Sequence, residues 1–237
     1  MNFKKLYLIL QFQHLIRKKV TMNVAEAETL LKEFKQPTEY PAFSQDSIYA
    51  PEYDLMIVVP VYNAVSYLEK CIQSILKQKT KFSYCTVFVD DGSTDGSNEI
   101  LNQYCNQKNV TVIHQKNKGI SSARNMALRK IYGRYVMFVD SDDYLPEYAV
   151  EQLLNIAVQY QADIVEGGYQ QFEQELQGKV YSHGKQTCQV SSDILYGYPW
   201  GKVISGRFFI DLCFPENYQF EDTIMATLLY PSCERIF

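Results

Sequence analysis

Residues 135–143 read YVMFVDSDD, an apolar run that stops abruptly at three carboxylates, Asp140, Asp142 and Asp143. Most side chains of the run are β-branched or aromatic and do not alternate with polar ones, which is typical of a parallel strand buried on both faces. Such strands present their C-terminal ends to ligands. Three neighbouring acids repel one another unless a cation lies among them, and oxygen ligands suit Mg²⁺ or Mn²⁺. Taken alone, the stretch predicts either a metal site or an Asp-rich turn that caps a helix beginning at Pro146.

Predicted strands and helices alternate around this stretch. Continuous apolar strands are expected at residues 55–59, 86–89, 110–114 and 162–165. Amphipathic helices are expected at 65–76, 98–107 and 146–161, and another helix follows residues 117–125 and ends at Gly133 as its C-cap. Short connections between alternating strands and helices require a parallel sheet covered on both faces. Residues 169–190 predict a hairpin over the site with a Gln177-Gly178 turn, and a last helix reaches about Tyr230.

Composition excludes several classes of protein. The chain has 237 residues, of which 46% are hydrophobic and 21% charged, as in an ordinary globular protein. A net charge of −4, with no Lys/Arg cluster among aromatic residues, argues against a nucleic-acid partner. The six cysteines are scattered without metal-binding spacing and are expected to be reduced cytosolic residues. No apolar run reaches the roughly 18 residues that a transmembrane helix needs.

The first 22 residues carry five basic residues and no acid. Two explanations remain open: a basic amphipathic helix lying on an anionic membrane, or a disordered or misannotated leader with Met22 as the true start. We expect residues 1–53 to form a helical extension and linker, and residues 54–237 to form the catalytic domain. The expected location is the cytoplasm, with peripheral contact at the inner face of the membrane through residues 1–22 as the alternative.

Four short motifs stand at the ends of predicted strands. They are IVVPVYN at 57–63, VDDGSTD at 89–95, NKG at 117–119 with ARN at 123–125, and VDSDD at 139–143. In that order and at those spacings they resemble the large family of inverting nucleotide-sugar glycosyltransferases with the GT-A fold (family 2-like). The resemblance covers residues 54 to 230. It implies a Rossmann-like, mostly parallel central sheet with helices on both faces and a small hairpin or acceptor subregion.

The resemblance also implies a nucleotide-binding site. It places the backbone around Pro60, the ring of Tyr62 with Asn63, and the carboxylate of Asp91 around the uracil and ribose of a UDP-sugar. A carboxylate can accept the uracil N3 hydrogen, and an aromatic ring can cover the face of the base. Two structural alternatives stay open: Tyr62-Asn63 as a helix entry with Asn63 as the N-cap, and Asp91 as a turn former.

The acidic stretch looks like the D-x-D element of that family. There the resemblance implies that Asp140 lies near the ribose, that Asp142 coordinates a Mn²⁺ or Mg²⁺ ion bridging the diphosphate, and that Asp143 shares the second role. The ion would neutralise charge on the departing UDP. Lys118 and Arg124 would offer positive charge to the phosphates, although Arg124 on a helix could instead bind a structural carboxylate.

Two later elements complete the resemblance. Glu221-Asp222 matches the acidic pair that supplies the general base, and we assign the base to Asp222 before Glu221; an acidic first turn favoured by the helix dipole is the alternative. Trp200-Gly201-Lys202 resembles a Trp-x-Lys element, in which the indole stacks on a sugar and Lys202 binds donor phosphate or acceptor. As the sole tryptophan, Trp200 could equally be a core residue.

These features imply a metal-dependent inverting glycosyltransferase, of hexosyl- or N-acetylhexosaminyl-transferase type. It would move a sugar from a nucleotide donor, UDP-linked by expectation, to a hydroxyl of a glycan or lipid-linked acceptor in polysaccharide or cell-surface glycan biosynthesis. A nucleotidyltransferase would need a Gly-rich basic loop where Pro60 follows the first strand. Because the chain is short after the last predicted helix, a truncated, non-catalytic nucleotide-sugar-binding partner subunit is the alternative. The sequence leaves the sugar, the acceptor and the oligomeric state open.

Overall fold

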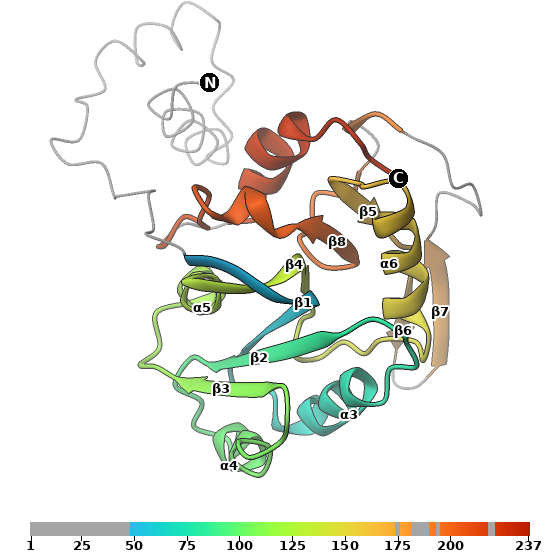
Figure 1. Ribbon diagram of the computed structural model, residues 1–237. Helices are drawn as coiled ribbons and strands as arrows, with labels where there is room; N and C mark the ends of the chain where they lie inside the picture. Colours follow the sequence, from blue (N-terminus) through green and yellow to red (C-terminus); the bar gives the residue numbers. More distant parts are fainter. Residues whose placement is uncertain (1–47, 174–175, 182–189, 193–194, 218–220) are drawn as a thin grey trace, which may run out of the picture. The chain divides into compact units, whose positions relative to one another are not determined.

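The computed structural model describes residues 48–173, 176–181, 190–192, 195–217 and 221–237 (Figure 1). The predictions for the segment before residue 48 lie outside the described residues. A six-stranded sheet in the order β3-β2-β1-β4-β8-β5 forms the centre of the described part. Its strands are β1 (Ile48–Val61), β2 (Tyr84–Asp90), β3 (Val110–His114), β4 (Lys130–Phe138), β5 (Ile164–Glu166) and β8 (Lys202–Ser205).

Most of the sheet is parallel, as the alternation of strands and helices predicted. β1 pairs in parallel with β2 and β4, and β2 pairs in parallel with β3. The sequence did not predict β8, which lies antiparallel between β4 and β5. This strand inserts a late segment of the chain beside β4, the strand that ends just before Asp140.

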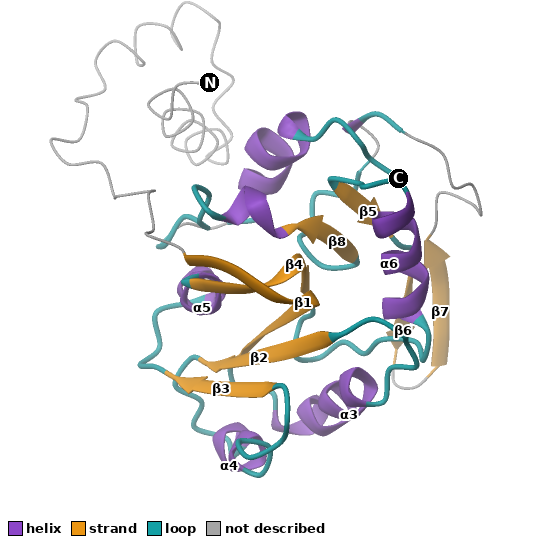
Figure 2. Ribbon diagram, viewed as in Figure 1, coloured by secondary structure: helices purple, strands orange, loops and turns teal. Residues whose placement is uncertain are grey.

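Helices cover both faces of the sheet (Figure 2). They are α3 (Val65–Leu76), α4 (Ser97–Asn102), α5 (Ile120–Leu128) and α6 (Ala149–Gln159). Alternate residues of β1 divide between two cores: Leu55 and Ile57 pack with residues of α3, α4 and α6, whereas Met56 and Val58 pack with α5 and the π-helical segment Met225–Leu229. Residues 55–59 of β1 are all fully buried, which explains why this half of the strand is a continuous apolar run.

Gly133 does not end a helix, so that prediction is wrong. The helix ends at Leu128, and Gly133 lies inside β4 opposite Tyr53 of β1. A Cβ on Gly133 would lie 2.3 Å from the backbone nitrogen of Met56. The glycine is therefore required by the close approach of two strands, a use of glycine that resembles a helix C-cap when only the sequence is read.

A separate hairpin follows β5. It consists of β6 (Tyr169–Glu173) and β7 (Leu176–Tyr181), and its register pairs Glu173 with Leu176. The hairpin was predicted, but its turn was misplaced, because Gln177 and Gly178 lie within β7. The predicted last helix is present as a helical turn at 223–224, the π-helical segment Met225–Leu229 and a 3₁₀ turn at Tyr230–Ser232.

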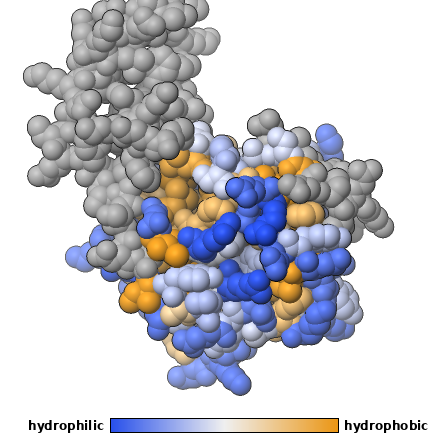
Figure 3. Space-filling model, turned by 45° about the horizontal axis from the view of Figure 1, so that its top comes forward, coloured by the Kyte–Doolittle hydropathy of each residue, from blue (hydrophilic) through white to orange (hydrophobic). Residues whose placement is uncertain are grey.

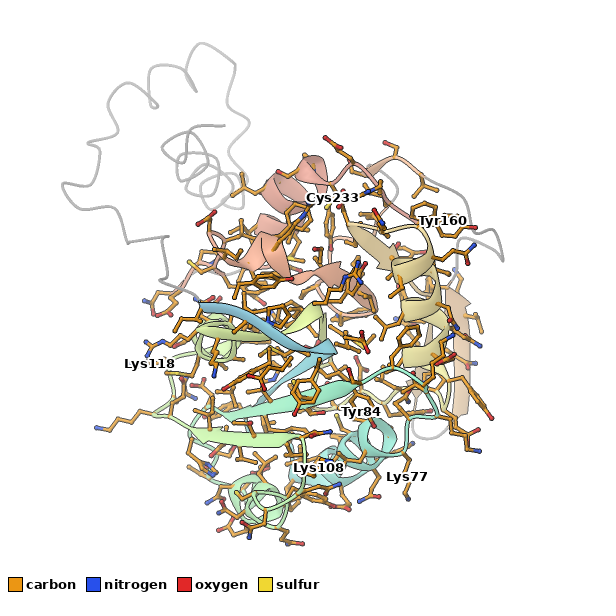
Figure 4. The ribbon with its side chains drawn as sticks, in the orientation of Figure 1. Lys77, Tyr84, Lys108, Lys118, Tyr160 and Cys233 are labelled. Carbon is orange, nitrogen blue, oxygen red and sulfur yellow. The ribbon has the colours of Figure 1, made fainter. Side chains whose placement is uncertain are left out.

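Side chains tie the helices to the sheet. Tyr84 of β2, labelled in Figure 4, donates its hydroxyl hydrogen to the carbonyl oxygen of Ile75 near the end of α3 at 3.0 Å. On the face shown in Figure 3, hydrophobic and hydrophilic residues are interspersed. Within the described residues, no helix is long and apolar enough to cross a membrane, and the cysteines described as free are Cys71, Cys85, Cys105, Cys213 and Cys233.

Candidate active site

A cavity of about 560 Å³ opens at the C-terminal ends of β1, β2 and β4. This is the edge of a parallel sheet at which ligands are expected to bind. Six of the predicted site residues line it: Pro60, Tyr62, Asn63, Asp91, Asp140 and Asp142. The remaining lining residues are Val61, Ala64, Tyr67, Asn117, Gly119, Ile120, Ala123 and Ser141.

Asp91 fixes one wall of the cavity. Its carboxylate accepts hydrogen bonds from the backbone N–H groups of Lys118 (2.9 Å) and Gly119 (2.7 Å) and from the side-chain amide of Gln115 (2.7 Å). These contacts hold the loop that leads into α5. The side chain of Lys118, labelled in Figure 4, is exposed, so its backbone rather than its ammonium group contacts Asp91.

Asn63, which lines the cavity, is hydrogen-bonded to the loop after β2. Asn63 adopts a left-handed backbone conformation (φ 50°), and its side-chain oxygen accepts a hydrogen bond from the Thr94 N–H at 2.8 Å. Asn63 is not the N-cap of α3, so that alternative is wrong: the cap position is Ala64. The carboxylate of Asp95 instead accepts the Val65 N–H at 2.9 Å from across the loop.

Two exposed tyrosines line the cavity. Tyr62 is 52% exposed and Tyr67, in the first turn of α3, is 59% exposed. Large rings that remain open to water beside a cavity are available to stack on a planar ligand. Sequence reasoning proposed Tyr62 but missed Tyr67, whose signal was an aromatic residue on the polar face of an amphipathic helix.

The acidic stretch after β4 forms a tight turn in which the Asp143 N–H donates to the carbonyl oxygen of Asp140 at 3.0 Å. Partial removal from water and the negative charges of Asp140 and Asp142 raise the pKa of Asp143 to about 6. Burial also raises the pKa of Asp140; Arg124 opposes this shift and Asp142 adds to it. Negative charge on Asp140 and Asp143 is therefore disfavoured unless a further cation lies nearby.

The donor set fits a hard divalent cation. Asp140 and Asp142 line the cavity together, and their oxygens are the ligands that Mg²⁺ and Mn²⁺ prefer. Among the described residues, no three His, Cys, Asp or Glu side chains are grouped to hold an ion. Asp140 and Asp142 would be the protein's ligands, since Mg²⁺ sites use one or two carboxylates when substrate phosphates supply further ligands.

Arg124 joins two acidic elements that lie far apart in the sequence. Its guanidinium donates to Glu221 at 2.9 Å and to Asp140 at 3.4 Å, and the residue is 2% exposed. The rings of Phe214 and Phe138 flank it, with centroids 5.1 and 6.0 Å from its Cζ atom. The sequence left two roles open for Arg124, binding of the donor phosphates or of a structural carboxylate. In the structure its guanidinium contacts carboxylates.

Asn125, the next residue of α5, anchors the segment that leads to the acidic pair. Its amide donates to the carbonyl oxygen of Phe214 at 2.8 Å, and its side-chain oxygen accepts the Phe214 N–H at 2.7 Å. The Asn125 side chain is buried, so this pair of hydrogen bonds to the backbone of Phe214 is shielded from water. Asn125 was not among the predicted site residues, although its place in the ARN motif was a signal.

Asp222 lies at the start of the last helical segment, where its carbonyl oxygen accepts the Met225 N–H at 2.9 Å. Burial and the neighbouring Glu221 raise the pKa of its carboxyl, while hydrogen bonding and the positive charge of Arg124 act in the opposite direction. A carboxylate with a raised pKa is a stronger base than one in water. Glu221, in contrast, is engaged by Arg124.

Trp200 and Lys202 lie beside β4 but do not line the cavity. Trp200 forms a parallel bridge with Phe138. The ammonium of Lys202 is 2.6 Å from Glu166, and its side chain is 1% exposed. It also donates to the carbonyl oxygen of Tyr198 at 2.8 Å, so the structure places Lys202 in a buried ion pair that sequence reasoning did not foresee.

A model of glycosyl transferase family 2 matches residues 56–222. The chain is 36% identical over 202 residues to glycosyltransferase GlyA of Streptococcus pneumoniae, covering 77% of the chain and 29% of that protein. It is 39% identical over 117 residues to a poly(ribitol-phosphate) beta-glucosyltransferase of Bacillus spizizenii, covering 48% of the chain and 18% of that protein. The structure resembles S. aureus TarS 1-349 in complex with UDP-GlcNAc, with a TM-score of 0.67 and 26% identity, covering 77% of this chain and 55% of that one. The chain thus spans less than a third of these two sequence relatives.

Proposed function

The chain belongs to glycosyl transferase family 2, and on that premise we propose that it transfers one sugar from a UDP-linked donor to a hydroxyl group of a glycan or lipid-linked acceptor, with inversion at the anomeric carbon. The reaction would contribute to a cell-surface glycan and would take place in the cytoplasm, where such donors are made.

One observation supports the proposal: Arg124 bridges Asp140, at the cavity, to Glu221, the neighbour of the proposed general base Asp222. Asp140 lies at the cavity with Asp142, and Glu221 precedes Asp222. A transferase with direct displacement needs a donor site and a base for the acceptor at one place. Arg124 brings these two parts of the chain, the stretch after β4 and the segment with Glu221-Asp222, close together.

In the proposed reaction, Asp222 accepts the proton of the acceptor hydroxyl while that oxygen attacks the anomeric carbon. The new C1–O bond forms as the bond from C1 to the diphosphate oxygen breaks, and UDP leaves with the bonding electrons. The raised pKa of Asp222 favours proton acceptance at the moment of attack. Asp91, Tyr62 and Asn63 would bind the uridine, because they line the cavity beside Pro60.

A Mn²⁺ or Mg²⁺ ion held by Asp142 and Asp140, with Asp143 adjacent, would neutralise charge on the diphosphate. Lys118, whose ammonium group lies on an exposed side chain, would add positive charge near the same group. Support for a UDP-sugar comes from TarS, which was crystallised with UDP-GlcNAc. Support for a cell-surface acceptor comes from the name of the poly(ribitol-phosphate) beta-glucosyltransferase.

The test is release of UDP from UDP-GlcNAc, UDP-glucose and other UDP-sugars in the presence of Mn²⁺. Asp222→Asn should lower the rate by on the order of 10²-fold or more, the usual contribution of a general base. Asp211→Asn is the matched control, since it removes an exposed carboxylate that does not line the cavity. Equal rates for Asp222→Asn and wild type would contradict the assignment, and UDP binding without turnover would favour the partner-subunit alternative.

A further inference from the structure

Five aromatic rings gather at the hairpin and the segment before β8. Tyr169 of β6 stacks on Tyr181 of β7, with centroids 4.7 Å apart and planes at 9°, and Tyr198 stacks on Trp200 at 4.8 Å and 7°. The edge-to-face contact of Tyr169 with Trp200, at 4.9 Å, joins the two pairs, and Tyr196 contacts Tyr169 at 5.5 Å. We call these five residues the aromatic platform.

Buried polar groups hold the platform in place. The carbonyl oxygen of Tyr198 accepts hydrogen bonds from the Lys202 ammonium (2.8 Å) and the Tyr230 hydroxyl (2.7 Å). Glu166 pairs with Lys202 and also accepts the Tyr196 N–H at 3.0 Å. With its backbone fixed and one face of its ring on Trp200, Tyr198 nevertheless remains 43% exposed.

The platform adjoins both acidic elements of the active site. Trp200 bridges to Phe138, two residues before Asp140. Tyr230, whose hydroxyl contacts Tyr198, directly follows the π-helical segment Met225–Leu229. The charge of Asp222 contributes, after burial and Glu166, to raising the pKa of Tyr230. None of the five platform residues is among those that line the 560 Å³ cavity, so the platform lies outside the donor pocket.

We propose that the aromatic platform is the acceptor subsite and that the exposed face of Tyr198 stacks on the apolar face of a pyranose ring. The inference rests on the proposed function and adds the acceptor class, a pyranose-containing glycan. An aromatic ring suits this ligand because a sugar presents C–H groups on one face and hydroxyls at its edge. A rigid ring also binds with little loss of conformational entropy.

Trp200 provides a direct reporter, because it is the sole tryptophan of the chain and part of the platform. Its fluorescence would be followed while the full-length protein is titrated with chitotriose, cellotriose and a galactose trisaccharide. We expect a saturable change with at least one of these sugars. Tyr198→Ala should weaken that binding about tenfold, Tyr198→Phe should retain it within about threefold, and Tyr148→Ala, which removes an exposed ring before α6, should leave it unchanged.

The inference fails if no sugar changes the emission, or if Tyr198→Ala, shown by circular dichroism to be folded, binds as tightly as wild type. Donor turnover by the wild-type protein, measured as UDP release without acceptor, separates this failure from failure of the proposed function. Turnover without sugar-dependent emission overturns the platform alone. Sugar binding that depends on Tyr198, in a protein without donor turnover, supports the platform and contradicts the transferase.

Discussion

At the scale of single residues, Arg124 connects the two acidic elements of the candidate site. Replacing it with Gln leaves Asp140 and Glu221 without their shared cation and frees the segment that carries Asp222. We expect kcat to fall on the order of 10²-fold, because a displaced catalytic group costs about that much, while the Kd for UDP changes little. Steady-state kinetics and calorimetric titration with UDP measure the two effects.

Arg129→Gln, at the exposed end of α5, is the matched control for this variant. The hypothesis that Arg124 contacts the phosphates makes the opposite prediction. In that case the Kd for UDP would rise as much as kcat falls. Such a result would show that the bridge to Glu221 rearranges when the donor binds.

The raised pKa of Asp222 leads to a prediction about the pH dependence of turnover. Its pKa is raised in the folded protein, so the base is lost as the pH falls through that raised value, and kcat/KM should decline on the acid side. Glu221→Gln removes the negative charge that raises the pKa of Asp222 and keeps Arg124, whose positive charge lowers it. The acid limb of the pH–rate profile should therefore move to lower pH in this variant; a shift to higher pH would contradict the assignment of the base.

At the scale of elements, the β1–β4 pair depends on Gly133. A Cβ there would lie 2.3 Å from two backbone atoms, those of Met56 N and Tyr135 O, which cannot retreat without breaking the sheet. Gly133→Ala should therefore lower the free energy of unfolding by about 3 kcal/mol or more. Gly197→Ala, where nothing lies within 4 Å, should change it by less than about 0.5 kcal/mol. Urea denaturation of both variants measures the difference, and equal stabilities would contradict the strand assignment of Gly133.

The segment before β8 depends on the Lys202–Glu166 pair. Burial lowers the pKa of Lys202 and Glu166 opposes that shift. Lys202→Met would leave a buried carboxylate without its cation and should cost about 3–5 kcal/mol in unfolding free energy. The double variant with Glu166→Leu should recover much of that loss, because removing both charges is often nearly neutral. A double variant no more stable than the single one would show that Glu166 has another role.

The elements differ in how far the sequence predicted them. Strands of the parallel core were predictable because burial on both faces leaves a continuous apolar run, as at Leu55 and Val58. β8 was missed because it has only four residues and pairs with strands distant in sequence. Gly133 was misinterpreted because close packing of strands and a helix C-cap both require glycine. The turn predicted at Gln177-Gly178 was misplaced, because both residues lie inside β7.

At the scale of the whole molecule, the predicted GT-A fold is confirmed by the sheet order and by the similarity to TarS. The motifs predicted the fold because each stands where a strand ends, and parallel strands bring such ends to one edge. The partners of individual side chains were not predictable. Arg124 and Glu221 are 97 residues apart in sequence, and Lys202 gave no sign of the burial that pairs it with Glu166.

The central claim, a UDP-specific and cation-dependent donor pocket, is tested most directly by thermal unfolding with UDP, GDP, CDP and dTDP, each with Mn²⁺ or with EDTA. At about 100 times its Kd, a ligand stabilises the folded state by about 2.7 kcal/mol. We therefore predict that UDP with Mn²⁺ raises the Tm by about 5–10 °C, more than the other nucleotides, and that EDTA removes the increase. A Tm increase with UDP that persists in EDTA would contradict the dependence on a cation. No Tm increase with any nucleotide would contradict nucleotide binding in the cavity.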